Sequence, residues 1–471
     1  MKGEEGRGEA EGGGSATLPR SVLSVGFVGP LPPTRSGIAD YDAEILSALS
    51  KNPSLSVAPY EPPAASRALL AGHDVLLMQI GNDPLHAPSV EALFDPRRRT
   101  PAVVVLHEFV LHHLFAAAYL TRSRPEDYAR ELERAHGARG RAFAATRKDG
   151  SYVPVWDLDP WLYPMSAGII RAAEAVVAHS ALVTGAVLAE CPGCRAITIP
   201  QHVAPAPRTP MAEAREALGF PRDRPAGITL GIVSPAKRIG KILEALATLP
   251  PERRPFFYIG GAVGEDDALR STVRENGLDE DVKFGGYLSE KDLWRAASAA
   301  TFAVNLRHPT MGETSHAVCR LAGFGLPLVV SDTGWFRELP DSFADKIPIG
   351  GDEVEQLARA MERLAFEPDL ARDRGRAASE WAVPRRPERI AEAYRAVLQE
   401  AADGWSRPRG ISGRVAESLA RLGIGQRGMH GGTSRAPDGA LLAEVAARAA
   451  GILPRPLQAP GGGELPPPIA E

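Results

Sequence analysis

The feature that most constrains the fold is an alternation of short apolar strands and helical segments that repeats along most of the chain. From Val22, the strand-like run VLSVGFV is followed by a Pro-rich loop and by IADYDAEILSALS, whose apolar residues recur at helical spacing. The runs DVLLMQI, AVVVLH, AVVAH and AITIP continue the series. Nearly continuous Val, Ile and Leu strands separated by helices are typical of a parallel sheet covered on both faces, so the pattern predicts an α/β fold.

The alternation occurs twice, on either side of the Pro-rich stretch QHVAPAPRTPMAEAREALGFPRDRPAG, which has the composition of a linker. After it come the strand-like runs ITLGIV, PFFYIG, VKF, FAVNL and LPLVV, again with helices between them. We therefore expect two doubly wound, Rossmann-like domains. Their strands would present their carboxyl ends to a central cleft, where ligands bind in folds of this kind.

The boundaries follow from changes in composition. We expect a disordered lead-in over 1–20, a first domain over 21–205 with an insertion at about 120–164, a second domain over 206–385, a closing helix over 386–403, and a low-complexity tail over 404–471. The insertion breaks the strand–helix rhythm with an amphipathic helix and an aromatic, Pro-rich segment.

Composition excludes several classes of protein. The net charge of −4 provides no basic field to recruit nucleic acid, so no nucleic-acid partner is expected. No apolar run approaches the roughly 18 residues of a membrane-spanning helix, and the N-terminus lacks the apolar core of a signal peptide. Three cysteines fit a reducing compartment, and we expect the CxxC pair Cys191 and Cys194 to form an ordinary turn without redox or metal chemistry.

Two loops carry candidate phosphate-binding residues. Gly37 opens a helix after the first strand, where backbone N–H groups can approach a phosphate, although the dinucleotide pattern GxGxxG is absent. Lys237 and Arg238 follow the first strand of the second domain, and adjacent cations there suit a diphosphate. The competing interpretation of the Gly37 loop is a plain strand–helix turn, and that of Lys237 and Arg238 is a solvated basic turn.

The most informative stretch is HPTMGETSHAVCRLAGFGLPLVVSD, in which polar residues precede a helix that leads into a buried strand. Thr314 and Ser315 are suited to cap that helix, and their hydroxyls and backbone donors can meet a ligand oxygen. Glu313 offers acceptors to sugar hydroxyls. A pure capping role, with Glu313 favouring the positive end of the helix dipole, is the alternative.

His107 ends a predicted buried strand in the sequence VVVLHEFVLHHLF. The zinc-protease pattern HExxH is not met, because His107 and His112 lie five positions apart and do not share a helical face. We therefore expect His107 to contact a polar ligand in the cleft and no metal to bind.

Taken in order, these segments resemble the GT-B retaining glycosyltransferases of family four over about residues 22–400. The resemblance is carried by the Gly37 loop, the strand end at His107, VVAHSA, SPAKRIGKILEAL and, most specifically, PTMGETSHAVCRLAGFGLPLVVSDTGWFRELP. Within the family, LRHPTMGETS and SDTGWFRELPD most resemble a bacterial subgroup acting on polysaccharide or cell-envelope glycans. The resemblance implies a cytoplasmic enzyme that moves a sugar from a nucleotide-sugar donor to a glycan, lipid-linked or other hydroxyl acceptor with retained configuration. It leaves open a peripheral association with the inner membrane.

The resemblance also implies roles for individual residues. Gly37 would lie near the donor diphosphate, Lys237 and Arg238 would neutralise it as it leaves, Glu313 would hold the hydroxyls of the donor sugar, and His107 would approach the transferred sugar. The leaving phosphate would help to deprotonate the acceptor, so the scheme needs no protein nucleophile, no metal and no cofactor.

The chain departs from the family pattern at its second motif glutamate, which binds the nucleotide ribose. Counted from either end of the motif, that position is Arg320 or Leu321. Arg320 cannot accept hydrogen bonds from a ribose, so we expect it to act as a further anchor for the diphosphate. Two alternatives therefore remain beside the active transferase: a catalytically inactive GT-B binding or assembly subunit, and a nucleotide-sugar epimerase.

Overall fold

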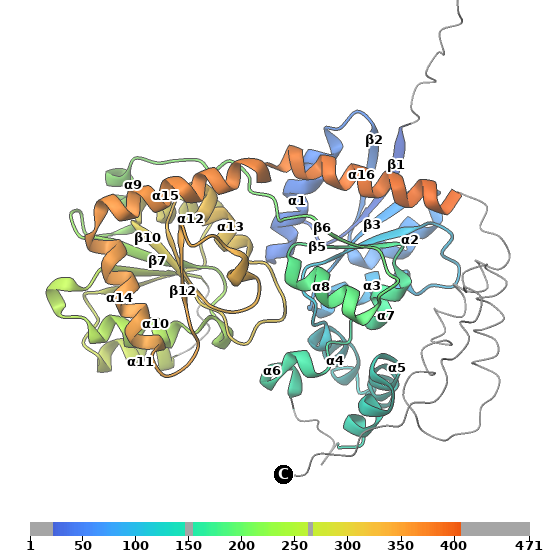
Figure 1. The fold of residues 1–471 in the computed structure, drawn as a ribbon, viewed down its shortest axis with the longest axis horizontal. Coiled ribbons are helices and arrows are strands. Elements are labelled where there is room, and N and C mark those ends of the chain that lie inside the picture. Colours follow the sequence, from blue (N-terminus) through green and yellow to red (C-terminus); the bar gives the residue numbers. More distant parts are fainter. Residues whose placement is uncertain (1–21, 147–153, 262–266, 407–471) are drawn as a thin grey trace, which may run out of the picture. The chain divides into compact units, whose positions relative to one another are not determined.

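The computed structural model describes residues 22–146, 154–261 and 267–406, which form two parallel six-stranded sheets (Figure 1). The first sheet has the order β2-β1-β3-β4-β5-β6, with β1 (Leu23–Val28), β2 (Leu55–Tyr60), β3 (Val75–Ile80), β4 (Ala102–Leu106), β5 (Ala175–Ala178) and β6 (Ala196–Thr198). The second has the order β12-β11-β10-β7-β8-β9, with β7 (Ala226–Leu230), β8 (Phe256–Gly260), β9 (Val282–Gly286), β10 (Phe302–Asn305), β11 (Leu328–Ser331) and β12 (Ala344–Ile347). The expected α/β fold is confirmed.

The first sheet is buried on both faces. Every residue of β3 and β4 is buried, and alternate residues enter different apolar clusters, with Met78 and Val104 on one side and Leu77 and Val105 on the other. This alternation follows from the two-residue period of a strand. The helices of this half are α1 (Gly37–Ser50), α2 (Ala65–Leu70), α3 (Ala87–Leu93), α4 (His112–Leu120), α5 (Pro125–Ala144), α6 (Val155–Leu158), α7 (Ala167–Ala172) and α8 (Ala181–Glu190), with 3₁₀ turns η1 (Pro62–Ala64), η2 (Pro84–His86) and η3 (Pro160–Leu162).

The second sheet is covered in the same way. Ile228 and Val330 enter one apolar cluster, while Val304 and Val329 enter another. The helices of this half are α9 (Met211–Leu218), α10 (Ile239–Thr248), α11 (Asp267–Glu275), α12 (Glu290–Ala299), α13 (His316–Phe324), α14 (Glu353–Phe366) and α15 (Pro368–Ala382), with 3₁₀ turns η4 (Pro235–Lys237), η5 (Pro251–Arg253), η6 (Gly334–Glu338) and η7 (Val383–Arg385). Helix α9 lies inside the stretch predicted as a linker.

Each sheet has a point at which the strand order reverses direction. In the first sheet this point lies between β1 and β3, and in the second it lies between β7 and β10. The loops that leave neighbouring strands at such a point diverge to opposite faces, which opens a crevice beyond the carboxyl ends of the strands. The candidate site residues are therefore to be sought in the loops after these strands.

The last described helix, α16 (Pro387–Ser406), returns to the first sheet. Ile390, Tyr394 and Leu398 are buried in the same apolar cluster as residues of β1 and α1. The hydroxyl of Tyr394 lies 2.8 Å from the hydroxyl of Tyr41 in α1, and both side chains are fully buried. The packing explains why a helix at the end of the second alternating series carries an apolar stripe.

The expected insertion contains the amphipathic helix α5, which is interrupted at Gly137, where φ is 60°. Its residue Tyr128 is buried beside His112, whose Nδ1 is hydrogen bonded to the carbonyl of Tyr163 at 2.7 Å. The ring of Trp156 lies 5.2 Å from that of His112. The aromatic residues of the insertion thus extend the apolar cluster on one side of the first sheet, and buried His112 packs among them.

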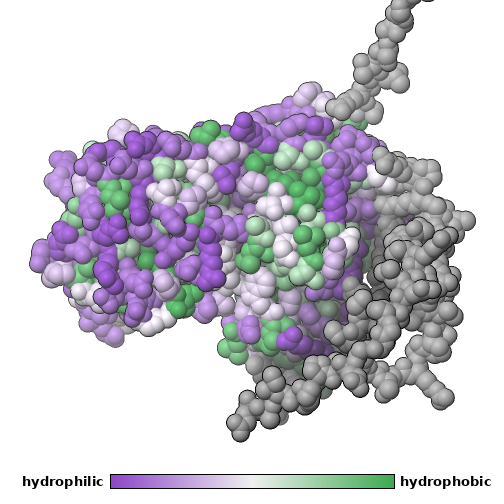
Figure 2. All heavy atoms as spheres, in the orientation of Figure 1, coloured by the Kyte–Doolittle hydropathy of each residue, from purple (hydrophilic) through white to green (hydrophobic). Residues whose placement is uncertain are grey.

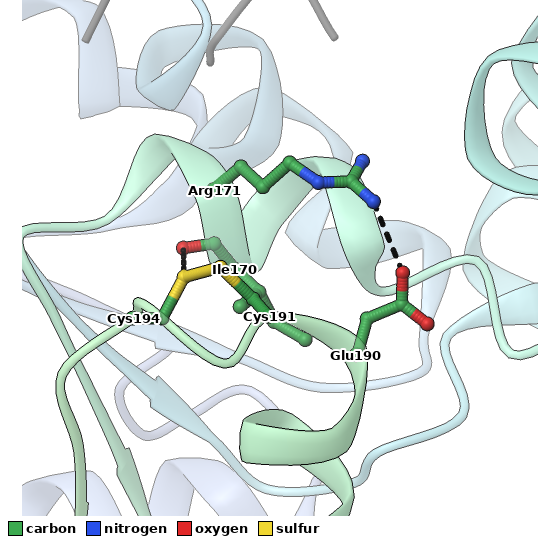
Figure 3. Close-up of a disulfide and its surroundings, with 5 residues drawn as sticks. All are labelled: Ile170, Arg171, Glu190, Cys191 and Cys194. Atoms are coloured by element: carbon green, nitrogen blue, oxygen red, sulfur yellow. Dashed lines mark hydrogen bonds and ion pairs between the residues drawn. A yellow bond between two sulfur atoms is a disulfide. The ribbon is translucent and has the colours of Figure 1, made fainter. Parts of the chain in front are cut away.

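The CxxC pair lies in a turn, as expected, but that turn also carries a disulfide, which was not expected from the sequence. Cys191 and Cys194 form a disulfide, and the carbonyl of Ile170 lies beside it (Figure 3). The turn that follows α8 brings the two Cα atoms to 5.4 Å, which is within the range that a disulfide spans. In the same view Arg171 pairs with Glu190 at the end of α8.

On the face drawn in Figure 2, hydrophilic side chains cover most of the second-sheet half, while apolar surface gathers over the first-sheet half near α8. Leu182 and Leu188 of α8 are exposed, which accounts for part of this apolar surface. None of the helices in the described ranges combines the length and the hydropathy needed to cross a bilayer. The predicted lead-in lies outside the described residues, as does the predicted tail beyond Ser406.

Candidate active site

Two basic side chains lie at the switch point of the second sheet. Lys237 ends η4 in the loop after β7, and Arg307 lies just beyond β10, the neighbouring strand. The ammonium group of Lys237 donates a hydrogen bond to the carbonyl of Leu230 at 3.0 Å. Burial, and then the positive charge of Arg307, lower the pKa of Lys237 to about 7. A bound anion would offset the repulsion from Arg307 and favour the protonated amine.

Glu313 is fixed by three neighbours. Its Oε2 accepts hydrogen bonds from the backbone N–H of Met311 at 2.6 Å and from the hydroxyl of Thr310 at 3.0 Å. Its Oε1 lies 2.9 Å from Nε of Arg307, an ion pair without hydrogen-bond geometry. The sequence pointed to Glu313 but missed Arg307, whose only mark in the sequence is its position directly after a strand.

Glu313 stands just before the mouth of α13. Ser315 is the N-cap of this helix, and its hydroxyl accepts a hydrogen bond from the backbone N–H of Val318 at 3.3 Å. The hydroxyl oxygen of Thr314 is buried and has no hydrogen-bond partner among the described residues. The first N–H groups of a helix lack intrahelical acceptors, so this mouth offers donors to an anionic ligand.

Gly37 begins α1 in the loop after β1. Ser36 is extended and caps the helix by accepting a hydrogen bond from the backbone N–H of Ala39 at 3.0 Å. A Cβ atom added to Gly37 would meet no atom within 4 Å. The packing of the chain itself therefore does not require glycine here, and the space over this residue is open to a ligand.

His107 lies at the carboxyl end of β4, where it is buried. Its Nε2 is hydrogen bonded to Oε1 of Gln79 at 2.9 Å, and its ring meets Tyr41 edge-on at 5.0 Å. Burial, and then the neighbouring His179, hold the pKa of His107 well below its usual value of 6.5. The imidazole is therefore neutral at physiological pH.

A hydrogen-bonded seam joins the loop after β4 to the loop that carries Glu313. The backbone N–H groups of Phe109 and Val110 both donate to the carbonyl of Met311 at 3.0 Å. Trp161 of the insertion stacks on Phe109, with ring centroids 5.2 Å apart, and its indole N–H donates to the carbonyl of Thr310 at 2.7 Å. The structure thus brings the His107 segment, the insertion and the Glu313 loop to one place.

Glu108, directly after His107, is part of this seam and was not singled out in the sequence. Its Oε2 accepts a hydrogen bond from the backbone N–H of Asn82 at 2.6 Å. Burial is the main reason that the pKa of Glu108 is raised to about 7. The hydrogen bond from Asn82 and the charge of Arg307 oppose this rise, and the charge of Glu313 adds to it. The dipeptide His107-Glu108 resembles the start of a zinc-protease motif, and nothing else in the local sequence marks the carboxyl group of Glu108 as a site residue.

The two arginines predicted to bind the donor have other partners. The guanidinium of Arg238 makes a two-pronged ion pair with buried Glu353, with Nε 2.9 Å from Oε1. Arg320 pairs with Glu290 at 2.6 Å and stacks over the ring of Trp294 at 4.5 Å. Arg307 therefore interacts with both Lys237 and Glu313. Arg238 and Arg320, which were predicted to bind the donor, pair with other residues.

Histidines also gather around the buried ring of Tyr41 without forming a metal site. The rings of His202, His179 and His316 lie 4.5, 5.1 and 6.4 Å from that of Tyr41. Nε2 of His202 lies 2.9 Å from Oε2 of Glu44. Throughout the described ranges, no group of three or more His, Cys, Asp and Glu side chains is arranged to hold a metal ion.

Comparisons with known proteins agree with this geometry. Residues 210–381, which include Lys237, Arg307 and Glu313, match the family described as glycosyl transferases group 1. No curated protein matches the chain.

Solved structures match over a larger part of the chain. A sucrose-phosphate synthase from Thermosynechococcus elongatus aligns with 81% of this chain and 100% of its own, at 15% identity and a TM-score of 0.60. Anabaena HepE in complex with UDP and glucose aligns with 80% of this chain and 100% of its own, at 16% identity and a TM-score of 0.55. The chain has the GT-B fold. AviGT4, a glycosyltransferase involved in avilamycin A biosynthesis, is similar over 81% of this GT-B chain and 98% of its own, at 17% identity and a TM-score of 0.50. The group 1 match points to sugar transfer, and the solved structures show the fold.

Proposed function

We propose that the chain is a metal-independent glycosyltransferase that moves a sugar from a nucleotide-sugar donor to a hydroxyl acceptor with retention of configuration. The observation that carries this proposal is the cluster of Lys237, Arg307 and Glu313 at the switch point of the second sheet. Cations beside a helix mouth suit a diphosphate, and a fixed carboxylate suits sugar hydroxyls.

In this proposal, Lys237 stabilises the negative charge that develops on the leaving diphosphate. Its ammonium group is held at the end of β7 by the carbonyl of Leu230, so it needs little reorganisation during the reaction. The mouth of α13, with Thr314 and Ser315, provides further donors to the phosphates. The open space over Gly37 leaves room for the same group on the first-sheet side.

Glu313 would accept hydrogen bonds from hydroxyls of the transferred sugar. Arg307 keeps a positive charge beside this carboxylate, and the N–H of Met311 fixes its orientation. Neutral His107, held by Gln79, would approach the same sugar from the first-sheet side. Arg238 and Arg320 take no part in the proposed binding of the donor, because Glu353 and Glu290 engage them.

The acceptor is proposed to be a glycan, a lipid-linked sugar or another hydroxyl compound of a bacterial cell envelope. Support for a nucleotide-sugar donor comes from HepE, whose solved complexes contain UDP, glucose and UDP-glucose. The insertion reaches the site through Trp161, and an aromatic side chain at the edge of a sugar site suits an acceptor.

A panel of nucleotide sugars incubated with the protein tests the proposal, with release of the nucleoside diphosphate as the readout. The expected result is release from at least one donor in the wild type and a loss of at least about 100-fold in Glu313→Gln, which keeps the hydrogen bond from Met311 but removes the charge. Tight binding of nucleotides without turnover would instead favour a binding subunit. Conversion of one nucleotide sugar into another would favour an epimerase.

A further inference from the structure

Hydrogen bonds join two segments of different sheets, each with a carboxyl group, in the candidate site. Glu108 follows β4 of the first sheet, and Glu313 precedes α13 of the second. The seam of hydrogen bonds from Phe109 and Val110 to Met311 ties their two segments to each other. Their proximity also shows in electrostatics, because the charge of Glu313 is the largest unfavourable charge acting on Glu108.

The two carboxyl groups do not have equal partners. Arg307 forms an ion pair with Glu313. In the part of the chain that the structure describes, Glu108 has no ion-pair partner and accepts a hydrogen bond from the neutral backbone N–H of Asn82. One arginine therefore serves two carboxyl groups, and the arrangement favours a charge on Glu313 and a proton on Glu108.

The charged groups around Glu108 act on its pKa in both directions. Asp83, in the loop that carries Asn82, raises the pKa of Glu108, and Arg307 is the charged side chain that lowers it. His86, across Gly81 from Glu108, is buried and has its own pKa lowered to about 4, so it is neutral. The net result is a pKa of about 7 for Glu108, with burial as its main cause.

Building on the proposed transferase function, we propose that Glu108 is a further donor-recognition residue, whose protonated carboxyl group donates a hydrogen bond to a hydroxyl of the transferred sugar. The same sugar hydroxyls would donate to ionised Glu313 from the second-sheet side. A sugar hydroxyl can accept one hydrogen bond and donate another, so an acid and a carboxylate together satisfy it, whereas two carboxylates cannot. Ionised Glu108 would have no proton to donate and would repel Glu313.

The proposal predicts a distinctive dependence on pH. Because the protonated form binds the sugar, kcat/KM for the donor should fall as the pH rises through about 7, the pKa of Glu108 in the free protein. If Glu108 were instead a general base, the ionised form would be active and kcat/KM would rise over the same range. The shape of the profile separates the two roles, because the rising limb of a base would combine with the falling limb of Lys237 into a bell.

Glu108→Gln is the informative variant, because its amide carbonyl still accepts from Asn82 while its NH₂ group donates at every pH. Lys237, whose pKa is also lowered to about 7, shares the alkaline limb, so log kcat/KM of the wild type should fall with a limiting slope of about −2. We expect Glu108→Gln to reduce this slope to about −1 and to retain kcat/KM at pH 6 within about tenfold of the wild type. Glu108→Ala should lose roughly 10- to 100-fold at pH 6, the range for a missing hydrogen bond to a buried polar partner. Glu91→Gln, an exposed carboxylate of α3, controls for the change in net charge.

A Glu108→Gln variant whose alkaline limb is as steep as that of the wild type would overturn the proposal, as would a wild type without such a limb. Inactivity of Glu108→Gln at all pH values, with a bell-shaped profile in the wild type, would assign Glu108 as a base and also overturn it. Absence of turnover of every nucleotide sugar by the wild type at pH 6 would contradict the proposed function itself, so the two failures are distinguishable.

Discussion

At the scale of single residues, the account depends first on Lys237. With its pKa lowered to about 7, this amine is largely neutral in the free protein above that pH, and a diphosphate must bring a proton with it. We predict that the affinity for the preferred nucleoside diphosphate falls as the pH rises from 7 to 9. Calorimetry in buffers of different ionisation enthalpy should show proton uptake on binding.

Replacing the amine tests its role directly. Lys237→Met should weaken binding of the nucleoside diphosphate by roughly 10- to 100-fold, the range for a lost charge-assisted hydrogen bond, and should affect the nucleoside alone much less. Lys241→Met is the matched control, because Lys241 lies one turn further along, in α10, and pairs with Glu244 at its surface. Equal losses in both variants would argue against a specific contact.

For Arg320 we expect a substitution to change the stability of the fold and not the affinity for nucleoside diphosphates. Its side chain is only 7% exposed and lies against Trp294 and Glu290, so it supports the packing of α12 against α13. Arg320→Met should lower the free energy of unfolding by about 1–2 kcal/mol, mostly through the lost stacking, since the carboxylate of Glu290 is largely exposed and screened. Affinity for nucleoside diphosphates should change less than twofold. A drop of tenfold or more would restore Arg320 as a diphosphate anchor.

The sequence identified some of the site residues but not their neighbours. Glu313 and Lys237 could be predicted because each stands beside a turn or a helix start that is recognisable from neighbouring residues in the sequence. Arg307 and Glu108 were missed, because their importance comes from strands that are adjacent in the sheets and not in the chain. Arg320 was assigned to the diphosphate because it stands at the position of the second motif glutamate, and its pairing with Glu290, thirty residues earlier, could not be read from the sequence.

At the scale of elements, the sequence predicted the central strands well, because strands buried on both faces are continuously apolar. It missed β2 and β12, which are edge strands. β2 contains exposed Ser56 and Pro59, and β12 includes the charged pair Asp345 and Lys346, so neither has an unbroken apolar run. The disulfide was missed because CxxC spacing alone does not tell whether a turn brings two thiols together.

The cap of α13 gives a prediction at this scale. Ser315→Ala removes the hydrogen bond to the N–H of Val318 and should lower the free energy of unfolding by about 1 kcal/mol. Donor affinity should fall as well, because the mouth of this helix is proposed to bind the phosphates. Ser289→Ala, which removes the equivalent cap of α12, should cost similar stability without changing donor affinity. Denaturant titration and calorimetry would separate the two effects.

At the scale of the whole molecule, each sheet contributes one part of the proposed chemistry. The second sheet provides Lys237, Arg307 and Glu313 for the donor, while the first provides neutral His107 and Glu108. The seam between Met311 and the segment after His107 holds these parts together. A reaction that relies on positioning and electrostatic stabilisation, without a protein nucleophile, suits such an arrangement.

The most direct test of the central claim is NMR spectroscopy of the wild-type protein with nucleotide sugars in the presence of a chelator, with water as the acceptor where no other is known. The account predicts slow release of the nucleoside diphosphate together with a free sugar whose first-formed anomer has the configuration of the donor. Loss of turnover in chelator, restored by magnesium or manganese, would contradict metal independence. Formation of the opposite anomer would contradict retention, and no release from any donor would contradict the transferase itself.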